Sequence, residues 1–156
     1  MAEITLNNIT NAKDLICFNT CPNIITIAST ASTITYASAR INVEGMYPTD
    51  NSKPSKIVIN GYTITGTDDI SKLQGKRFYK TTKNGSNSNF VCISIANALK
   101  SIPQISMNYN VIYAAGGVLT ITAKNSGAKY NLTIEKENLT NFSVMNNIKG
   151  LNTDEL

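Results

Sequence analysis

The stretch FVCISIANALKSIPQI (residues 90–105), followed by NYNVIYAAGGVLTITAK (108–124) and NSGAKYNLTIEKE (125–137), decides the fold of this 156-residue chain. In the first part, apolar residues recur at helical spacing and form one stripe. The residues of this stripe are Val91, Cys92, Ile95, Ala98, Leu99 and Ile102. The spacing predicts a helix over residues 89–101, which Pro103 ends because the residue before a proline is biased toward extended geometry.

The second and third parts alternate between apolar and polar residues, which is typical of strands with one buried face. Turns are expected at Gly116-Gly117 and at residues 125–127, which read Asn-Ser-Gly. The residues expected to point inward are Tyr109, Val111 and Tyr113 on the first strand, Leu119, Ile121 and Ala123 on the second, and Tyr130, Leu132 and Ile134 on the third. We therefore expect three consecutive antiparallel strands, with the helix covering their apolar face.

Upstream of the helix, the chain carries a hairpin signal and a loop. Asn60-Gly61 separates two apolar runs within residues 56–65, which predicts a hairpin with a tight turn. Residues 70–73 are expected to form one helical turn. The two prolines and the polar turn formers of residues 47–55 predict a loop between the N-terminal part of the chain and the core.

The N-terminal part is rich in β-branched residues, which favour strands. Runs at residues 15–19, 23–29 and 33–43 predict an antiparallel meander joined by short turns. Strict alternation breaks near residues 37–39, and this break predicts either a bulge or a change of face in the third run.

These elements together predict the fold class and the organisation of the chain. The class is α+β, mainly antiparallel β with sandwich-like sheets and one principal helix packed on a sheet. At this length we expect a single domain, residues 1–156. Within it we expect an N-terminal β element (1–45), an α+β core (54–136) and a C-terminal arm (137–156).

The chain is weakly charged and slightly basic. Charged residues make up 15% of it, against about a quarter in average proteins, and the formal net charge is +4. Basic residues are scattered except between Lys76 and Lys83, where Phe78 and Tyr79 lie among them. Such a run can hold single-stranded nucleic acid, but phosphate binding calls for a denser patch, so no direct nucleic-acid binding is expected. A weakly charged surface suits packing against other proteins, because fewer charges lose water at the interface. A genome whose codon usage favours Asn, Ile, Thr and Lys explains the same composition equally well.

The sequence offers little for catalysis. It has no histidine and three cysteines, Cys17, Cys21 and Cys92. Without imidazole, a serine or cysteine nucleophile lacks its usual base, and a zinc site lacks a common ligand. The acidic residues do not form the carboxylate-rich loop that calcium requires. We therefore expect no enzyme activity, no cofactor and no metal site, with all three thiols free.

Three motifs carry a resemblance to a known class of proteins. They are SIANALKSIP (residues 94–103), LTITAKNSGAKYNLTI (119–134) and VINGYTIT (58–65). Together they resemble a small α+β module of bacteriophage tail, neck and baseplate proteins, over residues 56–136. The Asn-, Ile-, Thr- and Lys-rich composition is similar to that of phages with AT-rich genomes, including the crAss-like phages. The resemblance implies a structural virion protein, a ring-type subunit of the neck or tail, made in the host cytoplasm.

The resemblance also implies the partners, which are copies of the same chain in a ring and neighbouring portal, neck or tail proteins. No stretch is long and apolar enough to span a bilayer, so no membrane partner is expected. The candidate interface residues are apolar positions in the weakly patterned ends of the chain: Ile4, Leu6, Ile9, Phe142, Val144 and Ile148. Deleting residues 141–156 is expected to leave residues 56–136 folded but to abolish assembly.

Two other functions compete with this interpretation. The first is a host-receptor or carbohydrate-binding module of a phage fibre or baseplate. Sugar sites favour exposed aromatic rings, whereas this chain has no tryptophan and only 7% aromatic residues. The second is a small DNA-binding protein, which rests only on the net charge and the basic run. A glycan array tests the first alternative, and the salt dependence of DNA binding tests the second.

Overall fold

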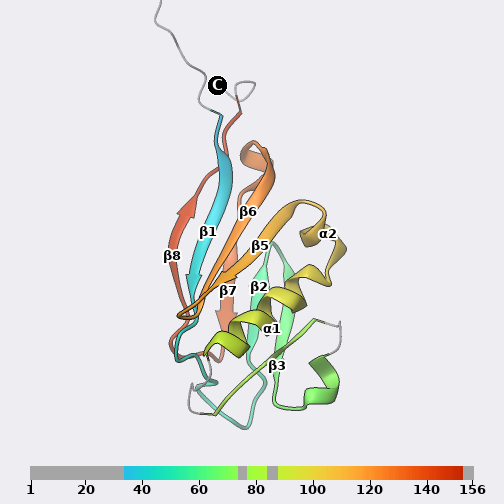
Figure 1. Ribbon diagram of the computed structural model, residues 1–156, viewed down its shortest axis with the longest axis vertical. Coiled ribbons are helices and arrows are strands. Elements are labelled where there is room, and N and C mark those ends of the chain that lie inside the picture. The colour runs from blue at the N-terminus through green and yellow to red at the C-terminus, as the bar shows by residue number, and fades with distance from the viewer. Residues whose placement is uncertain (1–33, 74–76, 84–87, 153–156) are drawn as a thin grey trace, which may run out of the picture. The chain divides into compact units, whose positions relative to one another are not determined.

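A computed structural model describes residues 34–73, 77–83 and 88–152 (Figure 1). The chain divides into two units, Met1–Ser32 and Thr33–Leu156, and the described residues all belong to the second unit. The predicted runs at residues 15–19 and 23–29 lie outside the described residues. The strands are β1 (Tyr36–Asn42), β2 (Lys56–Ile59), β3 (Tyr62–Thr67), β4 (Phe78–Lys80), β5 (Tyr109–Ala114), β6 (Val118–Ser126), β7 (Ile134–Glu137) and β8 (Ser143–Ile148). The helices are α1 (Ser88–Lys100) and α2 (Pro103–Ser106), with short 3₁₀ turns η3 (Ile70–Leu73) and η4 (Ala128–Tyr130).

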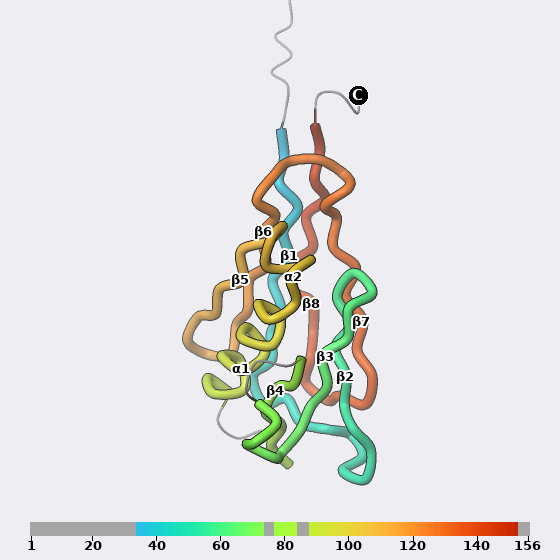
Figure 2. Tube along the Cα trace, turned by 90° about the vertical axis from the view of Figure 1, so that its right-hand side faces the viewer, coloured from blue at the N-terminus to red at the C-terminus, as the bar shows by residue number. Residues whose placement is uncertain are grey.

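The described strands form two four-stranded sheets. One has the order β5-β6-β1-β8 and is antiparallel throughout, and the other has the order β4-β3-β2-β7. Figure 2 shows β5, β6 and β1 on one side of the unit and β3, β2 and β7 on the other. A single hydrophobic core joins the inward side chains of both sheets and α1. The predicted class, α+β with mainly antiparallel sheets and one principal helix, is confirmed.

Helix α1 forms where the apolar stripe predicts it. Its buried residues include Val91, Cys92, Ile95, Ala98 and Leu99, all on the face that joins the core. The helix packs chiefly on β4 and β5, which are edge strands of the two different sheets. Pro103 follows the helix as predicted and then occupies the first turn of α2, where its missing N–H is not needed.

The Asn60-Gly61 hairpin is confirmed. Both residues have positive φ, 50° and 84°, as the favoured two-residue hairpin turn requires. The strands on either side pair in the expected register, from Lys56 with Thr65 to Ile59 with Tyr62. The bulge predicted near residues 37–39 is also present, because the pairing of β1 with β6 shifts register between Tyr36 and Ser38.

The predicted strand connections are wrong in two places. Strand β1 was expected beside the run at residues 23–29, but β6 and β8 pair with its two edges. The strand after residues 125–127 was expected beside β6, but β6 already has β5 and β1 as neighbours. It becomes β7 and pairs with β2 in the other sheet, after Gly127 (φ 121°) and η4 redirect the chain.

The predicted division into an N-terminal element, a core and a C-terminal arm is also wrong for the described residues. Strand β1, placed in the element 1–45, pairs with β6, placed in the core 54–136. The arm 137–156 contains β8, which pairs with β1. In this pairing Ile148 lies opposite Ser38 at one end and Ser143 lies opposite Asn42 at the other. Backbone hydrogen bonding to β1 fixes this segment although its side chains lack a clear alternating pattern.

Candidate interaction surface

Strand β8 forms one edge of the antiparallel sheet and is the outermost strand beside β1 in Figure 1. All six of its side chains are exposed, and three of them are hydrophobic. Val144 is 39% exposed, Met145 53% and Ile148 42%. An edge strand presents unpaired backbone N–H and C=O groups, and here they lie beside an uncharged, partly apolar row of side chains.

The other three sheet edges in the described part of the chain carry the protection that natural proteins use against pairing with another strand. Strand β5 has α1 and α2 packed against it, and both views place α1 beside it, although its Ile112 and Tyr113 side chains stay exposed. Strand β4 has only three residues and contacts both α1 and η3. Strand β7 carries Glu135, Lys136 and Glu137 in its four residues. Strand β8, in contrast, has no helix packed along it among the residues that the structure describes, and residues 138–148 contain no Asp, Glu, Lys or Arg.

The start of β8 is fixed to its own unit. The Phe142 side chain is only 6% exposed and belongs to the hydrophobic core. The Lys136 ammonium donates to the Phe142 carbonyl oxygen at 3.0 Å and lies 5.9 Å from the centre of its ring. Phe142 is therefore a core residue, and its prediction as an interface residue is wrong.

The end of β8 is fixed by close backbone packing. A Cβ atom on Gly150 would overlap the Gly127 carbonyl oxygen, so only glycine fits this position without a shift. The Gly150 N–H donates to Asn131 Oδ1 at 2.7 Å. Thr35 and Leu151 then exchange two backbone hydrogen bonds of 2.9 Å each, which extend the pairing beyond β8. The exposed edge is thus held rigidly at both ends.

A bulge in β8 decides which of its side chains share a face. Its pairing with β1 shifts register between Arg40 and Ile41, which leaves Met145 as the extra residue. Ser143, Asn146 and Ile148 lie opposite Asn42, Arg40 and Ser38 on the outer face of the sheet. Val144 and Asn147 lie opposite the buried Ile41 and Ala39 on the inner face, where Asn147 Nδ2 donates to the Leu132 carbonyl oxygen at 3.0 Å.

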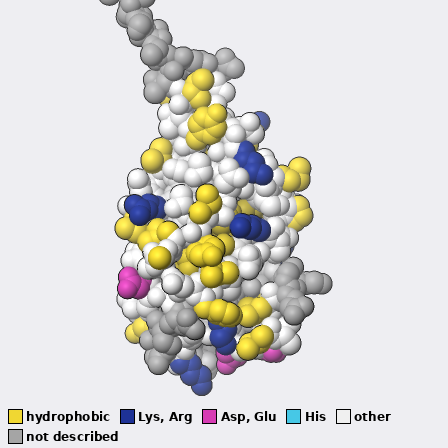
Figure 3. All heavy atoms as spheres, in the orientation of Figure 1, with side chains coloured by type: hydrophobic (Ala, Val, Ile, Leu, Met, Phe, Trp, Pro, Cys, Tyr) yellow, Lys and Arg dark blue, Asp and Glu magenta, His cyan; other side chains and the backbone are white. Residues whose placement is uncertain are grey.

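The predicted interface residues are therefore only partly brought together. Val144 and Ile148 lie on one edge strand, while Ile4, Leu6 and Ile9 lie outside the described residues. Met145, the most exposed hydrophobic residue of β8, was missed. The signal that could have found it is the uncharged run of residues 138–148. Figure 3 shows one face of the molecule, on which hydrophobic side chains form small separate patches and acidic side chains are few.

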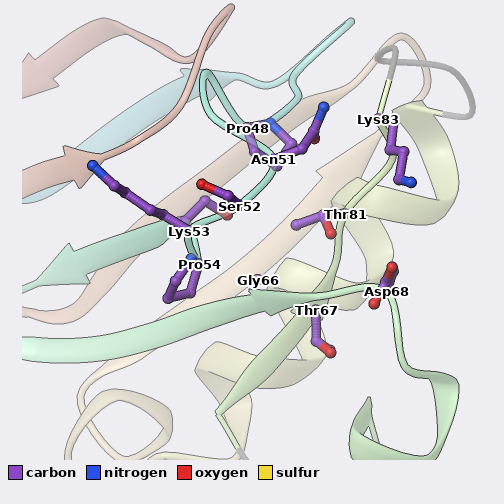
Figure 4. Close-up of a pocket in the computed structure, with 11 residues that line it drawn as sticks. Pro48, Asn51, Ser52, Lys53, Pro54, Gly66, Thr67, Asp68, Thr81 and Lys83 are labelled. Atoms are coloured by element: carbon purple, nitrogen blue, oxygen red, sulfur yellow. The ribbon is translucent and has the colours of Figure 1, made fainter.

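A second feature is a shallow cleft of about 230 Å³ at the carboxyl ends of the parallel strands β3 and β4 (Figure 4). It is lined by Pro48, Asn51, Ser52, Lys53, Pro54, Ser55, Gly66, Thr67, Asp68, Thr81 and Lys83. Lys53 and Lys83 lie on opposite sides of it, and the Lys53 amine points away. The lining supplies hydroxyls, a single carboxylate and the two lysines, which is not the paired acid and base that proton-transfer catalysis uses.

Within residues 34–73, 77–83 and 88–152, no three His, Cys, Asp or Glu side chains gather closely enough to hold a metal ion. None of the helices in these ranges has the length and apolar character needed to cross a membrane. Comparison with known proteins found no family model and no curated protein that matches this sequence. The best-defined candidate site is therefore the exposed edge of β8.

Proposed function

We propose that this protein is a structural subunit that acts through protein–protein interfaces and without catalysis, and that its assembly is a ring in a bacteriophage neck or tail. The observation that carries the assembly role is the edge of β8, which is uncharged, partly apolar and left without cover by the described residues. Adding a strand to such an edge gives main-chain hydrogen bonds and buries the apolar side chains beside them.

The phage part of the proposal is supported by the sequence. The motifs within residues 56–136 resemble the ring-forming modules of phage tails and necks, and the composition is similar to that of crAss-like phages. On this proposal the protein resides in the virion, and its partners are further copies and adjacent portal, neck or tail proteins. Val144, Met145 and Ile148 contribute the β8 contact, and Ile4, Leu6 and Ile9 remain candidate contacts from the N-terminal end.

The experiment introduces a charge at the β8 edge and compares it with the same charge at a protected edge. Met145→Lys places an ammonium in the middle of β8, while Glu135→Lys places one on β7, where charged residues already stand. Both positions are exposed, so both variants should fold, as circular dichroism and thermal melting would verify. We expect Met145→Lys to lower incorporation into purified virions, or into rings seen by negative-stain electron microscopy, at least tenfold. Glu135→Lys should be incorporated like the wild type.

Two results would overturn the proposal. Equal incorporation of Met145→Lys and Glu135→Lys would show that β8 is not an assembly contact. Absence of the wild-type protein from purified virions would remove the virion role altogether.

A further inference from the structure

We infer that β8 pairs with β8 of a second copy of this chain, antiparallel and about a twofold axis, to make one continuous eight-stranded sheet. This inference rests on the proposed function, since it takes β8 to be an assembly contact, and it goes further by naming the partner strand. The building block of the ring is then a symmetric dimer rather than a single chain. The β8 edge is used up inside this dimer, so contacts between dimers come from other surfaces, such as the candidate residues Ile4, Leu6 and Ile9.

The first argument is that, among the described residues, β8 is the sheet edge with the least cover. A head-to-tail contact between sheet edges would need two different free edges on each copy. Strand β5, at the opposite side of the same sheet, has α1 and α2 packed against it but keeps Ile112 and Tyr113 exposed, so it is more covered than β8. The edges of the other sheet are short or charged. When two copies join through sheet edges and each has one free edge, that edge must meet its own equivalent. Such a contact is isologous and closes after two copies.

The second argument is the register. If two β8 strands overlap fully and antiparallel, Ser143 of one copy faces Ile148 of the other, and Val144 faces Asn147. Residues directly opposite each other in a sheet must lie on the same face. In a regular six-residue strand, full overlap would violate this rule, because the first and last residues point to opposite faces.

The bulge at Met145 removes that conflict. It places both Ser143 and Ile148 on the outer face and both Val144 and Asn147 on the inner face. Full overlap therefore matches the faces on both sides of the bulge, and the two bulges meet at the twofold axis. The same irregularity that interrupts pairing with β1 makes this edge complementary to itself.

The third argument is electrostatic. Two copies of a chain with a formal net charge of +4 repel each other, so a self-contact requires a region without like charges. Residues 138–148 carry no charge. Lys149 directly follows this stretch, and in full overlap the two Lys149 residues lie at opposite ends of the paired β8 strands. The basic residue on the neighbouring strand is Arg40, and two β8 strands would separate it from its symmetry mate. The two Arg40 residues would then lie three strand spacings apart, which is roughly 14 Å. This distance exceeds the screening length of about 8 Å at physiological salt.

The test uses disulfide formation between two purified full-length variants, both carrying Cys17→Ser and Cys21→Ser. One variant carries Ser143→Cys and the other Ile148→Cys, and the remaining native thiol, Cys92, is buried. Under mild oxidation of the mixture, we expect a covalent heterodimer that reducing agent reverses. Each variant alone should form at least tenfold less dimer, because full overlap does not bring either position opposite itself. A chain with Glu135→Cys on β7, mixed with either variant, is the matched control and should give no such product.

The outcomes separate this inference from the proposed function. A heterodimer from the mixture, together with a wild-type dimer in mass photometry, supports the twofold β8 contact. If the mixture gives no heterodimer while Met145→Lys still blocks incorporation into virions or rings, β8 binds a different partner and the inference is wrong. If the wild-type protein is monomeric in solution and absent from virions, both the inference and the proposed function fail.

Discussion

The side chain of Asn60, in a hairpin turn of one sheet, donates from Nδ2 to the Tyr109 hydroxyl on β5 of the other sheet at 2.9 Å. The Tyr109 hydroxyl in turn donates to the Tyr130 carbonyl oxygen at 2.9 Å, and Asn60 Oδ1 accepts from the Thr133 N–H at 2.8 Å. Asn60 also has φ 50°, a conformation that asparagine tolerates better than most residues. Asn60 thus forms the hairpin turn and also links the two sheets through its side-chain hydrogen bonds.

Asn60→Gly tests the contribution of this hydrogen-bonded link, because glycine keeps the left-handed backbone and removes only the side-chain hydrogen bonds. We expect the free energy of unfolding to fall by about 1–3 kcal/mol, since the partly buried Tyr109 hydroxyl loses a partner, while the exposed Thr133 N–H can bond to water instead. Urea denaturation of Asn60→Gly, Tyr109→Phe and the double variant gives the coupling energy. Strictly additive effects would show that the two side chains do not act together.

A charge placed in the helix stripe should abolish folding. Leu99 is fully buried in α1, so Leu99→Asp leaves an unpaired charge in the core, at a cost of several kcal/mol or more. Asn97→Asp introduces the same side chain on the exposed face of the same helix and should leave the thermal melt nearly unchanged. Wild-type melting of Leu99→Asp would show that the stripe is not part of the core.

The C-terminal segment, residues 141–152, should be essential for stability. The sequence alone instead predicts that residues 56–136 stay folded without it. Truncation after Thr140 deletes Phe142 and β8 and exposes the edge of β1. We expect loss of the cooperative thermal transition in this variant. Truncation after Asn152 removes only residues beyond the described part and should melt like the full chain. A folded Thr140 truncation would show that β8 contributes little to the sheet.

Stability should decrease at alkaline pH through Cys92. Burial raises the pKa of its thiol to about 11, above its ordinary value of 9.0. The unfolded chain therefore releases this proton at lower pH than the folded chain, and the free energy of unfolding falls as pH rises from about 9 to about 11. Below about 9 the contribution is fully present. Denaturation of the wild type and Cys92→Ala across this range should give a shallower pH dependence for the variant, and equal slopes would contradict the assignment.

Buried Cys92 should also react slowly. We expect mass spectrometry of the non-reduced protein to find three free thiols, with Cys92 alkylated only after denaturation. A linked Cys17–Cys21 peptide from protein kept under alkylating conditions would contradict the expectation of free thiols. Rapid alkylation of Cys92 in the native protein would contradict its burial.

Local signals explain which parts of the fold could be predicted from the sequence. The stripe from Val91 to Leu99 determines a helix with one buried face, and Asn60-Gly61 determines a turn, because each depends only on neighbouring residues. The alternation of Leu119, Ile121 and Ala123 likewise reports the buried face of β6. These predictions agree with the structure because the local preference and the tertiary packing favour the same conformation.

Strand partners could not be predicted in the same way, because pairing depends on which edges remain free after other strands have paired. Nothing within β7 shows that β6 already has two neighbours and that β2 is available. Strand β8 lacks alternating burial altogether, so its place beside β1 has no signal in its own side chains. The candidate site could not be predicted from β8 alone either. An edge is unprotected when no other part of the chain packs over it, and that depends on the whole fold.

The pairing of β1 with β8 has a consequence for synthesis of the chain. Ser38 pairs with Ile148, about a hundred residues later, and such distant contacts form slowly because a long loop must close first. Strand β1 leaves the ribosome well before its two neighbours, β6 and β8. Its apolar face therefore cannot become part of a sheet until these two strands have been synthesised. The edge that we propose for assembly is therefore the last part of the sheet to be made. Nascent chains on one messenger RNA cannot associate through it before translation has passed residue 148, which restricts this contact to subunits whose sheet is already complete.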